Sequence, residues 1–197
     1  MRVIAGSLKG RRLTPPAWDG LRPTSDKLRE TLFNILAPRI AGARVMDGYA
    51  GTGASGIEAL SRGAAHVTFV DSDPRARALV AENLAHCGVT DGYAIIRGSI
   101  SQALATLRTA DAFDIILLDP PYGDLDLQAV LAVAGELVGV GGVLVLEHAR
   151  RHPAPGAAGR LVRSREVRCG DSALAFFEPL ASGRPSERRR KDRSEDL

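Results

Sequence analysis

Residues 43–56 read Ala-Arg-Val-Met-Asp-Gly-Tyr-Ala-Gly-Thr-Gly-Ala-Ser-Gly, and this stretch decides the fold. A short apolar strand, Ala43–Met46, leads into a G-x-G-x-x-G run from Gly51 to Gly56 and then into an amphipathic segment. Glycines at this spacing let the backbone turn sharply from a strand into a helix and approach a ligand closely. Asp71 follows about 20 residues later, where such units place an acidic side chain on a ribose. The stretch therefore predicts the first βα unit of a parallel sheet, with a ligand at its turn.

The remaining pattern repeats this unit along the chain. The expected strands are 43–46, 67–70, 93–97, 113–118 and 143–146, and the expected helices are 54–62, 74–86, 101–107 and 125–138. Strands that alternate with helices form a parallel sheet joined by right-handed crossovers. Two last runs, 161–167 and 173–177, are separated only by a short turn and predict a terminal hairpin. The fold class is therefore α/β, with a mostly parallel sheet.

The two ends of the chain differ from this core. Residues 1–24 predict a small β-hairpin, with strands at 2–5 and 11–14, and a proline-containing loop. A helix capped by Thr24 or Ser25 should follow and should stop at Pro38, because proline lacks the amide that continues a helix. We expect an N-terminal hairpin and loop at 1–24, the main domain at 25–180 and a disordered charged tail at 181–197.

Composition places the chain among ordinary globular proteins. Its 197 residues are 45% hydrophobic and 25% charged, which suits one α/β domain. No apolar stretch approaches the roughly 20 residues of a membrane span, and no export signal is visible. Cys87 and Cys169 have no metal-ligand partners at suitable spacing, so we expect reduced thiols and no metal. The expected protein is a soluble, cytoplasmic monomer without membrane contact.

Basic side chains gather in two regions of a chain whose net charge is +3. The N-terminal group is Arg2, Lys9, Arg11, Arg12, Arg22, Lys27, Arg29 and Arg39. The second group follows the last parallel strand and comprises Arg150, Arg151, Arg160, Arg163, Arg165 and Arg168. Such clusters favour a phosphate-bearing partner, although any single arginine is as easily explained as solvated surface charge.

A second motif, Asp119-Pro-Pro-Tyr122, directly follows the apolar run 115–118. Open α/β sheets place their chemistry at the carboxyl ends of strands, where this tetrapeptide lies. The Asp119 carboxylate and the Pro120 carbonyl can accept the two hydrogens of a planar exocyclic amine, while the Tyr122 ring stacks on the base that carries it. The alternative is a strand-ending turn closed by two prolines. The motif resembles that of the amino-methyltransferases, which methylate exocyclic nitrogens of adenine, cytosine or guanine with S-adenosylmethionine.

The glycine run alone fits a nicotinamide dinucleotide as well as S-adenosylmethionine. Asp47, between the strand and the glycines, favours the latter because a carboxylate attracts the ammonium and sulfonium groups and repels a pyrophosphate. Asp71 is expected to hold the ribose hydroxyls. After the third strand, Ser99 is expected to hydrogen-bond the adenine and Ile100 to contact it.

With these motifs in hand, the chain resembles one family more closely, the RsmD family of bacterial 16S ribosomal RNA guanine-N2 methyltransferases. The likeness rests on Arg2-Val-Ile-Ala-Gly6 with Lys9-Gly-Arg-Arg-Leu13, on Leu21-Arg-Pro-Thr24 with Arg29-Glu-Thr-Leu-Phe-Asn34, and on Glu58-Ala-Leu-Ser-Arg-Gly-Ala64. It covers about residues 1–180 and implies a Rossmann-like, seven-stranded methyltransferase fold. It also implies S-adenosylmethionine as cofactor and 16S ribosomal RNA or the small ribosomal subunit as partner.

The motifs and this resemblance together give the expected site. The expected catalytic residues are Asp119, Pro120 and Tyr122. The expected cofactor-binding residues are Asp47, Gly48, Tyr49, Ala50, Gly51, Gly53, Asp71, Ser72, Ser99 and Ile100. The expected RNA-binding residues are Arg2, Lys9, Arg11, Arg12, Arg22, Thr24 and Lys27.

The chain also departs from the family. Gly48, Tyr49 and Thr52 stand where the family commonly has Leu, Phe and Ser, so we expect altered packing around the methionine part of the cofactor. Three other functions stay open at this point: methylation of adenine N6 or cytosine N4 in DNA, a nicotinamide-dependent oxidoreductase, and a non-catalytic RNA-binding assembly factor.

Overall fold

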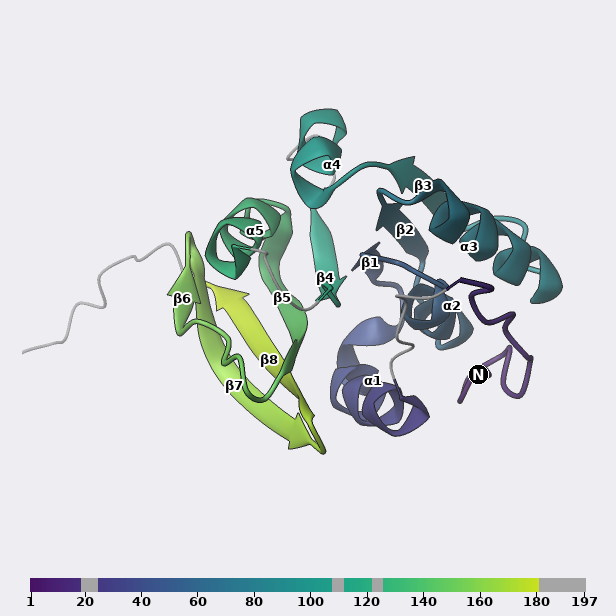
Figure 1. The fold of residues 1–197 in the computed structure, drawn as a ribbon, viewed down its shortest axis with the longest axis horizontal. Helices are drawn as coiled ribbons and strands as arrows, with labels where there is room; N and C mark the ends of the chain where they lie inside the picture. Colours follow the sequence, from purple (N-terminus) through teal and green to yellow (C-terminus); the bar gives the residue numbers. More distant parts are fainter. Residues whose placement is uncertain (19–24, 108–111, 122–125, 181–197) are drawn as a thin grey trace, which may run out of the picture.

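The computed structural model describes residues 1–18, 25–107, 112–121 and 126–180, and it contains one twisted sheet between two layers of helices (Figure 1). The strands are β1 Arg44–Gly48, β2 His66–Asp71, β3 Tyr93–Arg97, β4 Phe113–Leu118, β5 Val138–Ala149, β6 Ala157–Ala158, β7 Leu161–Cys169 and β8 Ser172–Pro179. The helices are α1 Asp26–Ile40, α2 Ala54–Ser61, α3 Pro74–His86, α4 Ile100–Thr106 and α5 Leu127–Gly135.

The strand order in the sheet is β3-β2-β1-β4-β5-β8-β7-β6. β1 to β5 run parallel, and β8 joins β5 in the antiparallel sense, followed by β7 and β6. The predicted α/β fold, with parallel strands and an antiparallel terminal hairpin, is thus confirmed. The sheet has eight strands among the described residues rather than seven, because the two residues of β6 pair with the start of β7.

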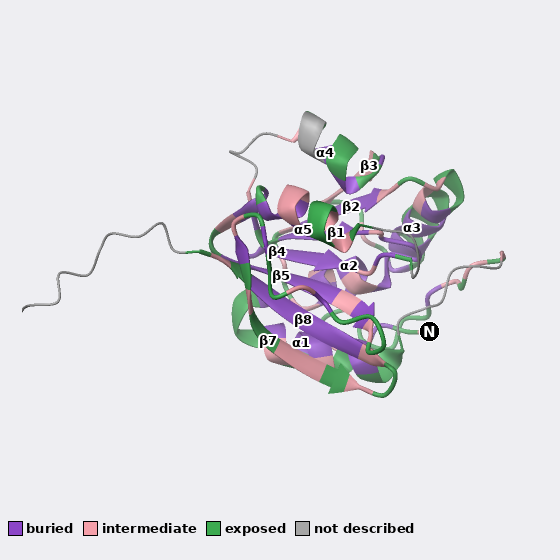
Figure 2. Cartoon of the chain, turned by 60° about the vertical axis from the view of Figure 1, so that its left-hand side comes forward, coloured by how far each residue is buried: buried purple, intermediate pink, exposed green. Residues whose placement is uncertain are grey.

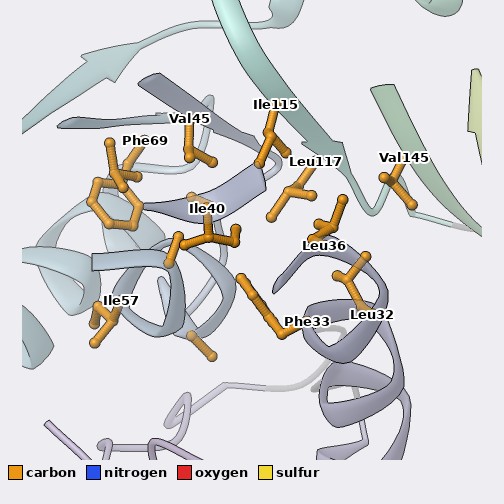
Figure 3. Packing of buried hydrophobic residues seen from close by; sticks show 14 of the residues in the cluster. Leu32, Phe33, Leu36, Ile40, Val45, Ile57, Phe69, Ile115, Leu117 and Val145 are labelled. Atoms are coloured by element: carbon orange, nitrogen blue, oxygen red, sulfur yellow. The ribbon is translucent and has the colours of Figure 1, made fainter. Parts of the chain in front are cut away.

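Two hydrophobic clusters fill the space on the two faces of the sheet. Helices α1, α2 and α3 cover one face, where Phe33, Leu36 and Ile40 of α1 pack against Ile115 and Leu117 of β4 (Figure 3). Helices α4 and α5 cover the other face through the second cluster. Neighbouring residues of a strand alternate between the clusters. β1, β2 and β4 are buried along most of their length, whereas β7 is partly exposed (Figure 2).

Local capping fixes the starts of the helices. Ser25 caps α1 by accepting a 3.2 Å hydrogen bond from the Leu28 amide, and Asp73 caps α3 just before Pro74. The predicted stop at Pro38 is wrong, because α1 continues through it to Ile40. Pro38 removes one hydrogen bond to the carbonyl four residues earlier, but that residue, Asn34, is exposed to water, and burial of Ile40 in the core favours one more turn.

The predicted boundary between α5 and β5 is also wrong. α5 ends at Gly135, and β5 begins at Val138, which pairs with Phe113 of β4. Three glycines, Gly139, Gly141 and Gly142, hide the start of this strand in the sequence. A Cβ on Gly142 would lie 3.0 Å from the Phe113 carbonyl oxygen, so close approach to β4 explains the glycine.

The N-terminal segment forms a looser hairpin than predicted. One antiparallel bridge, Arg2 to Arg12, replaces the two expected strands, with a 3.0 Å hydrogen bond from the Val3 amide to the Arg11 carbonyl. The segment is held to α2 by Glu58, whose carboxylate accepts hydrogen bonds of 2.7 and 3.0 Å from the amides of Ile4 and Ala5. Buried side chains of the main domain therefore replace the missing strand pairing.

Candidate active site

Three carboxylates lie in a row at the carboxyl ends of three neighbouring strands. Asp47 of β1 is in register with Phe69 of β2 and Leu117 of β4. Asp71 and Asp119 each come two residues after these partners, so they flank Asp47 on the two adjacent strands. Within residues 1–18, 25–107, 112–121 and 126–180, no group of three His, Cys, Asp or Glu side chains is arranged to hold a metal ion. The row places three negative charges side by side, which favours a cationic ligand.

Asp47 is the buried member of this row. Its side chain is 5% exposed, and Oδ2 accepts a 2.8 Å hydrogen bond from the Gly56 amide in the first turn of α2. Burial raises the pKa of Asp47 from 3.8 to about 7, and the charges of Asp119 and Asp71 add to this shift, whereas the Gly56 hydrogen bond opposes it. A cation bound beside Asp47 would stabilise the ionised carboxylate.

The glycine-rich turn connects Asp47 to Asp71. The Gly51 amide donates a 2.9 Å hydrogen bond to Asp71 Oδ2, and the amides of Tyr49 and Ala50 donate to the Val70 carbonyl. Gly51 and Gly53 have φ angles of 54° and 77°, which explains why glycine stands at both positions. The turn is thus fixed to the end of β2 before any ligand binds.

Tyr49 adopts a backbone conformation that is uncommon for a bulky residue. Its φ is 68°, and it is the one non-glycine residue with a positive φ in the part of the chain that the structure describes. Such a conformation costs on the order of 1 kcal/mol or more, and strained residues of this kind cluster at functional sites. Burial raises the pKa of the Tyr49 hydroxyl, so the ring is neutral at pH 7.

Ile100 and Ser99 lie at the start of α4, close to the end of β1. A Cβ on Gly48 would be 2.6 Å from Ile100 Cδ1 and 2.7 Å from Leu118 Cδ2, so these two side chains occupy the space that a larger residue at position 48 needs. The Ser99 hydroxyl accepts a 3.3 Å hydrogen bond from the Gln102 amide as part of a capping box. Its own hydrogen can still donate to a ligand.

The predicted catalytic tetrapeptide begins where β4 ends. Asp119 is half-buried, Pro120 is buried and Pro121 is exposed, while Tyr122 lies outside the described residues. The charge of Asp119 contributes to the raised pKa of Asp47, so the two carboxylates share one electrostatic environment. Ser72, at the end of β2, is exposed, and its carbonyl accepts a 2.9 Å hydrogen bond from Arg77.

The predicted RNA-binding side chains do not all lie at this edge. Arg2, Lys9, Arg11, Arg12 and Lys27 are exposed, and Arg22 and Thr24 fall outside the described residues. The turn that carries Lys9 is bound to Ser61 at the end of α2, and Arg11 Nη1 lies 3.5 Å from the His86 carbonyl oxygen at the end of α3. Helix α2 begins at the glycine-rich turn and runs away from it, so the turn that carries Lys9 lies away from the site edge. Arg11 instead approaches the last turn of α3, three residues after Asn83.

Thr14 is joined to the glycine-rich turn through Asn83 of α3. The Asn83 side chain accepts a 2.7 Å hydrogen bond from the Thr14 amide and donates one of 2.9 Å to the Thr52 carbonyl in the glycine-rich turn. Asn83 thereby links the N-terminal segment directly to the turn.

Comparison with known proteins identifies the family. The family model described as Conserved hypothetical protein 95 matches residues 1–178. YlbH of Bacillus subtilis is 39% identical over 181 residues, which cover 90% of this chain and 98% of YlbH. The chain is a member of the RsmD family.

Further RsmD relatives agree with this assignment. Ribosomal RNA small subunit methyltransferase D of Haemophilus influenzae is 40% identical over 123 residues, or 62% of this chain and 64% of that protein. The solved structure of Escherichia coli yhhF superposes with a TM-score of 0.79 at 31% identity and covers 91% of this chain and 97% of that one. The chain is an enzyme, an S-adenosylmethionine-dependent methyltransferase, which decides against the oxidoreductase and the non-catalytic factor.

The site of this RsmD member fits S-adenosylmethionine. The sulfonium and ammonium groups are cations, and they would stabilise the ionised form of Asp47, which lies buried between two other carboxylates. A pyrophosphate would add negative charge to the same row and would be repelled. Asp47, Asp71 and the turn between them are therefore the residues that would hold the methionine and ribose parts of the cofactor.

The sequence predicts no role for Glu58 or Asn83, and it groups Arg29 with the basic side chains that favour a phosphate-bearing partner. All three side chains instead hold the N-terminal segment. Arg29 and Glu58 are fully buried, and Asn83 is fully buried behind the glycine-rich turn. Arg29 donates to the Arg2 carbonyl, so it anchors the N-terminal segment from α1 as Glu58 does from α2. These residues could have been found as charged or amide side chains on the apolar stripe of a predicted helix. Such groups are rarely buried without partners, so each one indicates a contact with another part of the chain.

Proposed function

We propose that this RsmD member transfers the methyl group of S-adenosylmethionine to the exocyclic N2 amine of a guanine in 16S ribosomal RNA of the small subunit. The observation that carries the proposal is the row Asp71, Asp47 and Asp119, which joins a site for a cationic cofactor to the start of the Asp-Pro-Pro-Tyr motif. The choice of ribosomal RNA as the substrate is supported by the names of relatives such as the small subunit methyltransferase of Haemophilus influenzae.

The roles of the side chains follow from their chemistry. When bound, S-adenosylmethionine supplies an electrophilic methyl group. The Asp119 carboxylate and the Pro120 carbonyl accept the two amine hydrogens, which localises the nitrogen lone pair and orients it. Tyr122 stacks on the base, which must leave its helical stack to reach the edge of the sheet. Asp119 also accepts the proton that the amine loses on methylation.

The other predicted site residues contact the cofactor and the RNA backbone. Asp47 offsets the positive charge of the methionine part, and Asp71 accepts hydrogen bonds from the ribose while it holds the Gly51 amide. Ser99 donates to the adenine ring and Ile100 packs against it. The N-terminal hairpin and loop, residues 1–24, with Lys27 provide phosphate contacts over a wider RNA surface, and the enzyme acts as a monomer.

The direct test supplies labelled S-adenosylmethionine with small subunits that lack the modification, naked 16S ribosomal RNA and DNA in parallel. We expect label in the N2-methylguanine of RNA, and label mainly in DNA would contradict the proposal. Light scattering of the active fraction measures the oligomeric state.

A matched pair of variants tests the role of Asp119. Asp119→Ala should abolish transfer and leave cofactor affinity nearly unchanged. Asp114→Ala removes a carboxylate at the other end of β4, where Asp114 accepts a 2.8 Å hydrogen bond from the Arg44 amide, and should keep the activity. Equal loss of activity in both variants would contradict the assigned role.

A further inference from the structure

A second polar pocket lies outside the carboxylate row. The loop that follows β5 and the adjoining ends of β7 and β8 enclose it. Its lining includes His148, Arg150, Arg151, Arg163, Glu166 and Arg168. The pocket uses none of the residues assigned to the cofactor or to the target base.

His148 forms a buried part of the lining and has an unused polar atom. The side chain is 4% exposed, and Nδ1 lies 3.1 Å from the His152 carbonyl oxygen and 3.2 Å from that of Ala149. Carbonyl oxygens only accept hydrogen bonds, so the hydrogen of the neutral ring sits on Nδ1. Nε2 has no hydrogen-bond partner among the described residues, which is costly for a buried polar atom.

The charge of the pocket is positive. Four arginines line it, against the two carboxylates of Glu166 and Asp171. Glu166 pairs with Arg163 and Arg168 at 3.1 Å each, and its Oε2 lies 3.9 Å from His148 Nε2. The Arg151 side chain is exposed and forms no hydrogen bond or ion pair with any described residue. The surplus of arginine favours an oxyanion, and a protonated His148 would add a donor toward it.

The pocket shares an edge of the sheet with the catalytic motif. β5 runs parallel to β4, and Leu146 is in register with Leu118. Asp119 follows Leu118 by one residue and Ala149 follows Leu146 by three, so both lie at the same edge of the sheet. With strands about 4.8 Å apart and a rise of about 3.3 Å per residue, Ala149 in the lining lies roughly 8 Å from Asp119. A nucleotide next to the target base can reach it.

We propose that this pocket binds a backbone phosphate of the RNA substrate close to the methylated guanine, through Arg150, Arg151 and Arg168, with His148 below them. This assignment rests on the proposed function for the identity of the polymer, although the phosphate chemistry can be tested without it. It extends the RNA-binding surface from the N-terminal segment to the opposite end of the sheet.

The experiment uses the full-length protein and two pocket variants, Arg151→Gln and Arg168→Gln. Arg165→Gln is the matched control, because Arg165 is on the same strand as Arg168 but lies 5.9 Å from the Phe176 ring, on the other face of the sheet. Affinity for S-adenosylmethionine reports whether each variant keeps its fold.

Two titrations give the readouts. Inorganic phosphate should shift the ring signals of His148 in the NMR spectrum of the wild type and of Arg165→Gln, and should shift them far less in the pocket variants. Affinity for a 16S ribosomal RNA fragment should fall about tenfold in each pocket variant, and the slope of log affinity against log salt should fall by about one. In the control, Arg165→Gln, the RNA affinity and the salt slope should stay near those of the wild type.

The outcomes separate the pocket from the proposed function. Equal losses of RNA affinity in Arg165→Gln and in the pocket variants would overturn the inference, even if the wild type methylates RNA. Phosphate binding with unchanged RNA affinity would mean that a small phosphate compound occupies the pocket, and would overturn the assignment to RNA. A wild type that methylates no RNA refutes the proposed function, whereas the response of His148 to phosphate still measures the pocket directly.

Discussion

Replacing Asp47 by asparagine should stabilise the cofactor-free enzyme and weaken its binding of S-adenosylmethionine. The carboxylate is buried between Asp71 and Asp119, and its pKa rises from 3.8 to about 7. Asparagine cannot ionise, but its side-chain oxygen can still accept the hydrogen bond from the Gly56 amide. The variant therefore removes the buried charge and keeps the contact with α2.

The size of the effect follows from the pKa. Below pH 3.8 the carboxyl group is protonated in both the folded and the unfolded chain. Between pH 3.8 and about 7 the folded protein keeps a proton that the unfolded chain loses, so the free energy of unfolding falls as the pH rises. A shift of about 3 pKa units corresponds to about 4 kcal/mol, which is fully lost above pH 7. Asp47→Asn should thus match the wild type near pH 4 and exceed it by up to about 4 kcal/mol at pH 8.

Urea unfolding of both proteins between pH 4 and pH 8 measures the difference in their free energies of unfolding. Titratable groups that the two proteins share contribute equally and do not affect this difference. Calorimetry of S-adenosylmethionine binding gives the functional side, where the variant should lose about 10- to 100-fold in affinity. Wild-type binding at pH 7 should release about half a proton per site, because the bound cation lowers the pKa of Asp47 from about 7. Parallel unfolding curves for the two proteins across this pH range would refute the reasoning.

Further predictions concern packing and anchoring around the site. Gly56→Ala places a Cβ 2.2 Å from the Phe69 ring and should lower the free energy of unfolding, measured with urea, by about 1–3 kcal/mol. Gly156→Ala is the control, because no atom lies within 4 Å of the added Cβ, and it should change this free energy little. Glu58→Gln removes the charge that pairs with Arg62 at 2.7 Å and should cost about 3–5 kcal/mol. It should also speed hydrogen exchange at the Ile4 and Ala5 amides, and unchanged exchange there would contradict the anchoring role of Glu58. The exposed Glu136→Gln is its control.

Much of the fold follows from local sequence patterns. β3, α3 and β4 begin and end at the predicted residues because apolar periodicity, the Asp73 cap and Pro74 are all local signals. The errors arise where tertiary contacts override such signals. Burial of Ile40 carries α1 past Pro38, and pairing with Phe113 starts β5 among glycines that look like a loop.

The candidate site divides in the same way. The order of strands in a parallel sheet places Asp47, Asp71 and Asp119 at one edge, so the sequence could predict that they meet there. It could not predict that Glu58, Arg29 and Asn83 fix the N-terminal segment, because these contacts join residues 27 to 69 positions apart.

The sequence by itself determined the glycine-rich turn, the α/β alternation and the chemical types gathered at the site. Only the tertiary structure decided how these groups act on one another. It buries Asp47 between two other carboxylates and raises its pKa to about 7, and it places Lys9 beside the end of α2, away from the glycine-rich turn. It also leaves His148 Nε2 without a hydrogen-bond partner among the described residues, in an arginine-lined pocket. The physical reason is that charge interactions and desolvation depend on distances through space, which residue spacing along a chain does not contain.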